Sequence, residues 1–293
     1  MNKIKIMTDS ASDIPAELEA EYAIRILPFP VTIGEEGYLE RVDFNNKEFY
    51  DMLIAAPKIP TTSQITAIQF YEEFKAIQKE GYREVIYTSI NSKGSSTYNN
   101  ALMAKEQLFE KHPELIDEFK IHVVNSATYT IAYGYPVIEA AKKAQKGSSS
   151  AEIVAYLEDW FNSVEIYFAP FTLEFVKKSG RVPVAAAFVG ELIGLRPIIS
   201  IINGETKIVE KVRGDKAIIP ALLKYAQNAI VPKTPYMIVK GIMEEEAIEL
   251  FEKSNKQFGY FATDNYYVGA SISINAGPKV VGIIVKGRNR NHD

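Results

Sequence analysis

Two runs of hydroxyl side chains in this sequence precede segments that are expected to be helical. The first run, Thr61-Thr62-Ser63, follows Pro60 and leads into apolar residues at every third position. This spacing predicts a helix that begins between Ser63 and Thr66, so the hydroxyls would lie at its N-terminus. Unpaired backbone N–H groups and the positive end of the helix dipole favour an anion there, and hydroxyls add donors without adding charge. Thr62 or Ser63 could instead only cap the helix. The expected apolar face consists of Ile68, Tyr71, Phe74 and Ile77.

The second run lies between residues 91 and 99, after a buried-strand pattern at residues 84–89. It contains Ser95 and Ser96 and precedes a predicted helix that continues through Leu108. Gly94 would let the backbone approach a ligand closely, or would simply make the turn. Both runs therefore indicate hydrogen-bond donors for an anionic ligand at helix N-termini.

A third polar loop contains a carboxylate that could join these hydroxyls. Residues 4–7 predict a strand, residues 8–15 a loop rich in hydroxyls and carboxylates, and residues 16–21 a short helix. In an open α/β sheet ligands bind at the carboxyl ends of strands, which makes Asp9 a candidate site residue. The alternative is that Asp9 only ties down the following turn.

The order strand, polar loop, helix occurs three times in the first half of the chain. The third instance has a strand at residues 119–124 and a helix at residues 130–143. This repetition predicts a mostly parallel sheet with helices on both faces, a three-layer α/β domain whose polar loops gather at one edge. A further helix at residues 151–161 completes it, so we expect a domain boundary near Ser163 and a first domain of residues 1–163.

The second half, residues 164–293, has the pattern of an α+β domain. Asn203-Gly204 separates two β-branched runs at residues 197–202 and 206–211, which predicts a β-hairpin and hence antiparallel strands. Residues 265–275 carry mixed signals, and we make no prediction for them. The remaining predicted elements are strands at residues 165–169, 236–240 and 280–286, and helices at residues 173–178, 216–229 and 244–256.

Composition narrows the class of protein. A length of 293 residues favours two domains. The net charge is −4 and acidic and basic residues are mixed along the chain, so the sequence shows no basic cluster that would indicate nucleic-acid binding. The absence of cysteine excludes disulfides, thiolate metal sites and a cysteine nucleophile. The sequence has no signal-peptide pattern and no membrane-spanning apolar run, so we expect a cytoplasmic protein without a metal or other cofactor.

Six short motifs resemble those of the DegV family in order and spacing along nearly the whole chain. Each motif is weak alone, whereas their combination is specific. The motifs are Thr8-Asp9-Ser10, Pro60-Thr61-Thr62-Ser63-Gln64, Ser95-Ser96-Thr97-Tyr98, Lys177-Lys178-Ser179-Gly180-Arg181, Lys211-Val212-Arg213-Gly214 with Lys216-Ala217, and Gly277-Pro278.

This resemblance implies a non-catalytic two-domain α/β protein that binds one long-chain fatty acid at the junction of its domains. Several family members act as the acyl-carrying subunit of a bacterial fatty acid kinase, whose separate ATP-binding subunit phosphorylates the carboxylate. The resemblance therefore implies a role in fatty acid metabolism or lipid transport in a bacterial cytoplasm. A fatty acid kinase ATP-binding subunit would be the protein partner, with at most transient membrane contact.

The resemblance also implies roles for individual residues. Thr62 and Ser95 would hold the fatty acid carboxylate, with Asp9 and Ser63 as supporting residues. Such charge-assisted hydrogen bonds contribute about 1.5–3 kcal/mol each. Arg181 corresponds to the family arginine near the pocket mouth, where it would meet the carboxylate or a partner. Candidate walls for the acyl chain, which ordinary core packing explains equally well, are Phe168, Phe171, Phe175, Ile193 and Ile198.

The chain departs from the family pattern at three positions. Asn275 stands where the family usually has a histidine, Ser96 where it commonly has glycine, and Asn125 where it commonly has aspartate. Ser96 and Asn275 would therefore be supporting residues beside the head group. Asparagine does not titrate near neutrality, so Asn275 loses any proton-coupled role. We expect fatty acid binding to survive these changes, which bear mainly on docking to a kinase subunit.

A serine-dependent hydrolase is one alternative function for the same loops. A nucleophilic Ser63 or Ser95 would need a base. No sequence feature places Lys93 against either hydroxyl. The histidines, which all lie outside the motif loops, are His112, His122 and His292.

A binder of a phosphorylated small molecule is the other alternative. It would use the same helix N-termini, because these favour any anion. Lys93 and Gly94 match a phosphate loop only weakly, because such loops usually carry several glycines or a positioned lysine.

Overall fold

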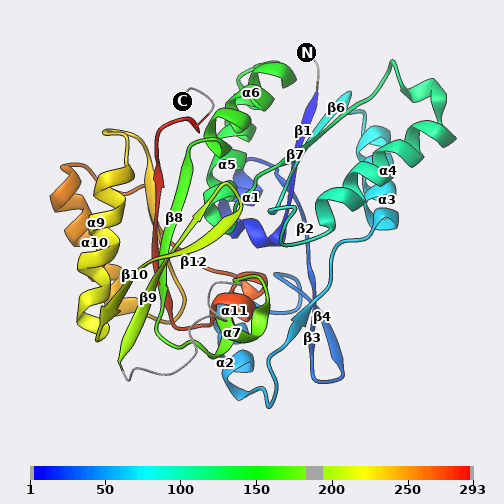
Figure 1. Cartoon of the computed structure of the whole chain (residues 1–293). Helices are drawn as coiled ribbons and strands as arrows, with labels where there is room; N and C mark the ends of the chain where they lie inside the picture. The colour runs from blue at the N-terminus through cyan, green and yellow to red at the C-terminus, as the bar shows by residue number, and fades with distance from the viewer. Residues whose placement is uncertain (1–2, 183–193, 291–293) are drawn as a thin grey trace.

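The computed structural model describes residues 3–182 and 194–290, which fold into two main sheets with helices around them (Figure 1). The first sheet has four strands in the order β2-β1-β6-β7, and each neighbouring pair is parallel. The parallel sheet predicted for the first half of the chain is therefore confirmed. Its strands are Ile4–Asp9 (β1), Arg25–Leu27 (β2), Glu84–Ser89 (β6) and Lys120–Asn125 (β7).

Helices cover both faces of this sheet and make the three predicted layers. Helices α3 and α4 pack against each other beside β6 and β7, while α5 and α6 pack together on the opposite face (Figure 1). The polar loops that follow β1, β6 and β7 meet at one edge, as expected for parallel strands. The four helices are Ala67–Lys79 (α3), Thr97–Lys111 (α4), Ile131–Gln145 (α5) and Ser150–Phe161 (α6).

Helix α3 starts at the C-terminal end of the predicted range, residues 63–66. Its N-cap is Thr66, whose hydroxyl accepts a hydrogen bond from the Gln69 N–H while the Gln69 side chain accepts one from the Thr66 N–H. The predictions that Thr62 or Ser63 caps this helix, or stands at its N-terminus, are wrong. The reciprocal bonds of Thr66 and Gln69 satisfy two helix donors at once, which fixes the start of the helix.

The buried face of α3 also differs from the prediction. Phe70, Phe74 and Ile77 are fully buried, whereas the side chain of Ile68 is 74% exposed. The face therefore follows a spacing of four and then three residues rather than a strict repeat of three. A strict repeat of three drifts around a helix that has 3.6 residues per turn.

The second sheet has six strands in the order β10-β9-β8-β13-β11-β12. Its neighbours are antiparallel, except for the parallel pair β11 and β12. The α+β character predicted for the second half is thus confirmed. The strands are Val164–Pro170 (β8), Leu195–Ile202 (β9), Glu205–Arg213 (β10), Tyr236–Lys240 (β11), Asn265–Tyr267 (β12) and Val280–Lys286 (β13).

The predicted hairpin joins β9 to β10. Asn203 and Gly204 form its turn with φ angles of 51° and 75°, both in the left-handed region. Asn-Gly tolerates this conformation, and its twist matches that of the flanking strands. The outer face of the second sheet is covered by helices Ile218–Ala229 (α9) and Glu244–Phe258 (α10).

Strand β8 shows how the two sheets share a core. Ile166 and Phe168 point into the first core, which also contains α5, whereas Tyr167 and Ala169 point into the second core beneath α9 and α10. Successive side chains of a strand alternate between its faces, which explains this division. Helix α5 contacts β1 of the first sheet and β8 and β11 of the second, so the two halves of the chain pack directly on each other.

A small third sheet, β4-β3-β5, was not predicted. It joins Thr62 to Val31, two residues that are far apart in the sequence, and it packs with α2 and α11. Short elements of this region and of the loops are Ala16–Glu21 (α1), Pro30–Ile33 (β3), Glu36–Leu39 (β4), Asn46–Ala55 (α2), Thr61–Thr62 (β5), Glu174–Ser179 (α7) and Ala270–Ala276 (α11), with 3-10 turns at Ser10–Ser12, Pro113–Leu115 and Asp215–Ala217.

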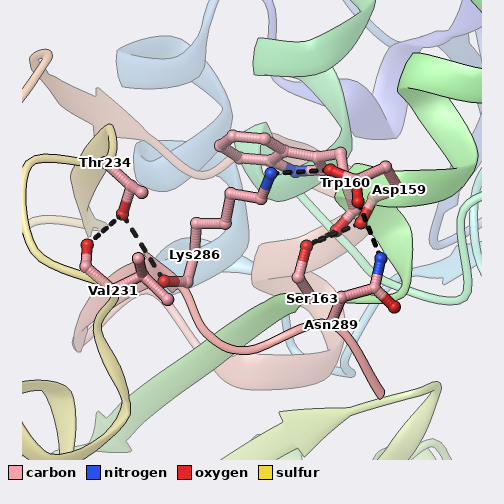
Figure 2. A network of polar contacts seen from close by, with 7 residues as sticks. All are labelled: Asp159, Trp160, Ser163, Val231, Thr234, Lys286 and Asn289. Atoms are coloured by element: carbon pink, nitrogen blue, oxygen red, sulfur yellow. Dashed lines mark hydrogen bonds and ion pairs between the residues drawn. The ribbon is translucent and has the colours of Figure 1, made fainter. Parts of the chain in front are cut away.

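A polar network holds the chain where it passes from the first half to the second (Figure 2). The Lys286 ammonium and the Asn289 amide both donate to the Asp159 carboxylate at 2.7 Å, from the end of β13 to the end of α6. The Ser163 hydroxyl donates to the Asp159 carbonyl oxygen at 2.6 Å. These contacts tie both halves together beside the predicted domain boundary, which stays a prediction.

Candidate functional site

A cavity of about 720 Å³ opens between the two main sheets, a volume typical of small-molecule sites. Its lining comes from both halves of the chain. Buried apolar residues form the wall, among them Phe29, Ile90, Phe168, Val182, Ile201 and Val280. Exposed polar residues stand at its mouth, namely Ser63, Gln64, Lys93, Ser96, Arg181 and Glu205.

Most of the site residues expected from the sequence meet at this cavity. They come from β5 and the residues after it, from the start of α4, from the end of α7 and from α11. The expected residues that line the cavity are Thr62, Ser63, Ser95, Ser96, Arg181 and Asn275. Asp9 is the exception, because it lies behind the cavity wall.

Ser95 takes part in a chain of hydrogen bonds at the start of α4. The Ile65 N–H donates to Thr97 Oγ1 at 3.3 Å, and Thr97 Oγ1 lies 2.9 Å from Ser95 Oγ. The Thr97 N–H also donates to Ser95 Oγ at 3.3 Å. When the Thr97 hydroxyl donates to Ser95 Oγ, the Ser95 proton is left to donate to a group in the cavity.

Thr62 is positioned by a strand rather than by a helix. It pairs with Val31 in the small sheet, and the next residue, Ser63, donates its N–H to the Pro30 carbonyl at 3.0 Å. The side chain of Thr62 is half-buried and lines the cavity. Helix α3 begins five residues further on at Ala67, so its dipole adds little at Thr62.

Asp9 is fully buried and supports the loop that follows β6. Its carboxylate accepts hydrogen bonds from the Tyr133 hydroxyl (2.6 Å), the Tyr87 hydroxyl (2.9 Å) and the Ile90 N–H (3.1 Å). Burial raises the pKa of Asp9 to about 6, although the bonds from Tyr133, Ile90 and Tyr87 oppose this shift. Because Ile90 lines the cavity and Asp9 does not, Asp9 supports the wall from behind through the bond to the Ile90 N–H.

Two further buried carboxylates hold α11 against the first half of the chain. Asp13 accepts hydrogen bonds from the Gly269 N–H (2.9 Å) and the Thr130 hydroxyl (2.5 Å). Glu40 accepts from the Ser271 N–H (2.9 Å) and from the Ser271 hydroxyl (2.6 Å). Burial, and then the charge of Glu40, raise the pKa of Asp13.

These two carboxylates matter for the site because Thr130 and Ser271 line the cavity. Neither acid was predicted as a site residue from the sequence. Asp13 belongs to the polar loop that was singled out around Asp9, which was a usable signal. Glu40 lies outside every motif, although the Ser10 hydroxyl of the first motif donates to it at 2.6 Å; its other partner, Ser271, lies 231 residues away.

Charged residues at the mouth are exposed. Lys93 and Glu205 approach to 3.3 Å across the cavity mouth, from the loop after β6 to the start of β10. Arg181 donates its guanidinium N–H to the Ser179 carbonyl at 3.0 Å. An exposed pair such as Lys93 and Glu205 contributes only about 0–1 kcal/mol to stability.

The three departures from the family pattern have distinct surroundings. Asn275 lines the cavity and donates its amide to the Ser271 carbonyl at 2.8 Å. Asn125 accepts from the Ser92 and Ala127 N–H groups, both at 3.1 Å, and so shapes the loop that leads to Ser95. Ser96 is the N-cap of α4, but its side chain makes no capping hydrogen bond.

The candidate wall residues divide between cavity and core. Phe168 lines the cavity, as expected. Phe171 and Ile198 belong to the core beneath α9 and α10, and Phe175 packs against the cluster around α2 and α11, so core packing explains these three. Ile193 lies outside the described residues.

The arrangement gives no support to a serine nucleophile. His112 and His122 lie away from the cavity lining, and His292 is outside the described residues. His112 lies 3.1 Å from Glu114, and His122 lies 3.5 Å from Glu84. Lys93 is directed to Glu205 rather than to a hydroxyl.

Residues 3–182 and 194–290 contain no group of three or more histidine, cysteine, aspartate or glutamate side chains that could hold a metal ion. None of the helices in this part of the chain is long and apolar enough to span a membrane.

Comparison with known proteins places the chain in a family. The model described as "Uncharacterised protein, DegV family" matches residues 3–287. A DegV domain-containing protein of Clostridium perfringens is 32% identical over 282 residues, which cover 96% of this chain and 97% of that protein.

Solved structures share the fold over the whole length. A structure from Bacillus subtilis, described as DegV, a fatty acid binding protein, has a TM-score of 0.81 and 26% identity, and the match covers 98% of this chain and all of that one (100%). A fatty acid kinase B3 protein of Streptococcus pneumoniae, loaded with linoleic acid, has a TM-score of 0.83 at 17% identity, with 98% and 100% covered, which shows a common fold. From the family match and the shared two-sheet fold, we conclude that this chain belongs to the DegV family.

Proposed function

We propose that this protein binds one long-chain fatty acid in the cavity between its two sheets. The observation that carries the proposal is a cavity with an apolar buried wall and a polar mouth, in a chain of the DegV family. A fatty acid has the same division into an apolar chain and a polar head. The Bacillus subtilis relative of this fold is described as a fatty acid binding protein, which supports the proposal.

Ser95 and Thr62 are the proposed donors to the carboxylate. A carboxylate only accepts hydrogen bonds, so it would orient the hydroxyl pair such that Thr97 donates to Ser95 and Ser95 donates to the ligand. The Ile65 N–H donates to Thr97 and extends this chain, which polarises each bond in it. Each charge-assisted bond to the carboxylate would contribute about 1.5–3 kcal/mol.

Several residues would support the head group without holding it. Ser63 and Ser96 are exposed beside Thr62 and Ser95, where they keep the mouth polar. Asn275 offers a neutral amide whose N–H is already directed to Ser271. Arg181 stands at the mouth, and we propose that it reaches the carboxylate or the surface of a partner.

The acyl chain would lie along the buried wall formed by both sheets. Phe168 and Ile201 contribute to it from the second sheet, and Phe29 and Ile90 from the first half of the chain. Each CH₂ group removed from water contributes about 0.8 kcal/mol, so the tail supplies most of the affinity. The hydroxyls then fix the direction in which the acid lies.

We further propose that the protein is a non-catalytic carrier in fatty acid metabolism or lipid transport in the cytoplasm. Neutral hydroxyl donors leave the bound acid without a tight ion pair, so its carboxylate stays available for further chemistry. A fatty acid kinase ATP-binding subunit is the proposed partner, and membrane contact would be transient. With Asn275 in place of a histidine, any proton transfer would come from the partner.

The alternative ligand, a phosphorylated small molecule, would use the cations at the mouth. Arg181 and Lys93 favour it, but Lys93 is already paired with Glu205. The buried apolar wall would stay unused. The fatty acid therefore fits more of the cavity.

Native mass spectrometry of the purified protein tests the proposed function. The mass excess of the folded protein is measured first, and the molecule is then released by denaturing extraction and identified. We expect one long-chain fatty acid per chain. A phosphate ester would support the alternative, and an empty protein that also fails to bind palmitate and oleate would contradict fatty acid binding.

A further inference from the structure

Resting on the proposed function, we propose that Tyr129 is a third hydrogen-bond donor to the ligand's carboxylate. Tyr129 follows β7 and lines the cavity together with Ser95 and Arg181. No motif of the sequence analysis included it. Its assignment comes from the hydrogen bonds of one neighbour, Asn91.

The side-chain amide of Asn91 has only one orientation that satisfies its partners. Its oxygen accepts from the Lys93 N–H at 3.1 Å, and a backbone N–H can only donate. Its nitrogen donates to the Gly204 carbonyl at 3.1 Å, and a carbonyl can only accept. The same nitrogen lies 2.9 Å from the Tyr129 hydroxyl oxygen. The fixed amide therefore donates to Tyr129, and the phenol oxygen is an acceptor in this bond.

The phenol proton of Tyr129 is consequently not used by Asn91. It can be donated to another acceptor, and the ring stands at the cavity wall where such an acceptor would arrive. The bond from Asn91 also makes the phenol a better donor, because linked hydrogen bonds polarise one another.

The position of the phenol matches the expected head group. A Cβ atom added to Gly94 would lie 2.4 Å from the Tyr129 hydroxyl oxygen, so this oxygen rests directly on the backbone that precedes Ser95. Any side chain at residue 94 would displace the ring. The absence of a side chain at Gly94 thus lets the Tyr129 hydroxyl lie against the loop.

The phenol also stays protonated under ordinary conditions. Burial raises the pKa of Tyr129, opposed by the hydrogen bond with Asn91 and by the positive charge of Arg181. A neutral phenol donates to a carboxylate, whereas a phenolate would repel it. Arg181, whose charge acts on this hydroxyl, also lines the cavity.

The variant Tyr129→Phe keeps the ring and removes only the hydroxyl. Its dissociation constants for palmitate and for methyl palmitate are measured by displacement of a fluorescent fatty acid. We expect palmitate to bind about tenfold or more weakly, because a hydrogen bond to a charged acceptor is lost. Methyl palmitate, which is neutral at the head, is expected to change by less than about threefold.

The matched control is Tyr71→Phe, which alters a half-buried tyrosine on α3 outside the cavity lining. It should leave both affinities and the thermal midpoint unchanged. Equal weakening of both ligands by Tyr129→Phe would make the residue a structural one and overturn the inference, as would unchanged binding of palmitate. Failure of the unaltered protein to bind palmitate would instead refute the proposed function, and the inference with it.

Discussion

Removal of the Ser95 hydroxyl is expected to weaken fatty acid binding by about 1.5–3 kcal/mol, or about 10- to 150-fold in the dissociation constant. Ser95 Oγ is the last group of the chain that begins at the Ile65 N–H and passes through Thr97. Ser95→Ala removes the proposed donor to the carboxylate. Thr97 keeps the bond from Ile65, so the start of α4 should stay folded.

The neighbouring Ser96 provides a control at the same helix end. Ser96 also lines the cavity, but its side chain makes no capping bond, so Ser96→Ala should leave the affinity within about twofold of the unaltered protein. Thr62→Val and Thr61→Val form a second matched pair, because both residues lie in β5 but Thr61 is outside the cavity lining. The double variant of Thr62 and Ser95 should lose several kcal/mol at most, on the order of two charge-assisted bonds.

The assay is displacement of a fluorescent fatty acid by palmitate, with thermal unfolding of each variant as the test of folding. We expect a large loss of palmitate affinity for Ser95→Ala and Thr62→Val and no loss for Ser96→Ala and Thr61→Val. Unchanged palmitate affinity in a folded double variant would place the head group elsewhere. Equal losses at Ser95 and Ser96 would mean that the helix end as a whole, rather than one hydroxyl, holds the acid.

Three other predictions concern charge, volume and backbone contact. The pKa of Asp9 in the folded protein is about 6, above its usual value of 3.8, so the protonated carboxyl stabilises the fold below pH 4 by about 3 kcal/mol, and this contribution is lost as the pH rises through 6. In urea unfolding, Asp9→Asn should therefore flatten the decline of the unfolding free energy between pH 4 and 7. A decline parallel to that of the unaltered protein would refute this. Ala276→Leu adds three carbons at the cavity wall and should weaken palmitate binding by about 2 kcal/mol, measured by displacement, through lost burial of the tail; unchanged affinity would put the tail elsewhere. Gly241→Ala would bring a Cβ atom to 1.9 Å from the Pro278 carbonyl oxygen and should lower the free energy of unfolding in urea by about 3 kcal/mol. Gly37→Ala is the control, because a Cβ atom there meets open space and should leave the stability nearly unchanged.

Elements with strong local signals agree closely with their predictions. The strands at residues 236–240 and 280–286 have the predicted bounds, because each is a buried β-branched run flanked by residues that break strands. The hairpin at Asn203-Gly204 was predictable because two adjacent residues supply the whole turn conformation. In these segments the decisive interactions are made within a few residues.

The start of α3 shows where local patterns compete. Thr62, Ser63 and Thr66 are all good capping residues, and Thr62 or Ser63 was the predicted cap. The pairing of Thr61 and Thr62 with β3 draws them into an extended strand. Thr66 is left with Gln69 three residues later, which completes the reciprocal cap.

Part of the cavity lining was predicted from the sequence. The motif resemblance identified Thr62, Ser95 and Arg181, all of which line the cavity, because the family motifs mark their positions directly. Glu40 and Tyr129 have no such marker, and Asp13 was marked only by the polar loop that it shares with Asp9. Their partners Ser271, Asn91 and Gly269 lie 231, 38 and 256 residues away, and no periodicity in the sequence reports contacts of that range.

The sequence alone determined the two-sheet architecture, the hydroxyl-bearing loops and the family, because strand and helix periods, turn residues and motif order are local properties of the chain. Only the tertiary structure decided which hydroxyls face the cavity, which carboxylates are buried behind it and which phenylalanines form core instead of wall. The physical reason is that burial and hydrogen-bond pairing arise from long-range packing of the two sheets. Asp9 illustrates the difference. The sequence showed a carboxylate in a polar loop after a strand, whereas its position behind the cavity wall depends on hydrogen bonds from Tyr87 of β6 and Tyr133 of α5.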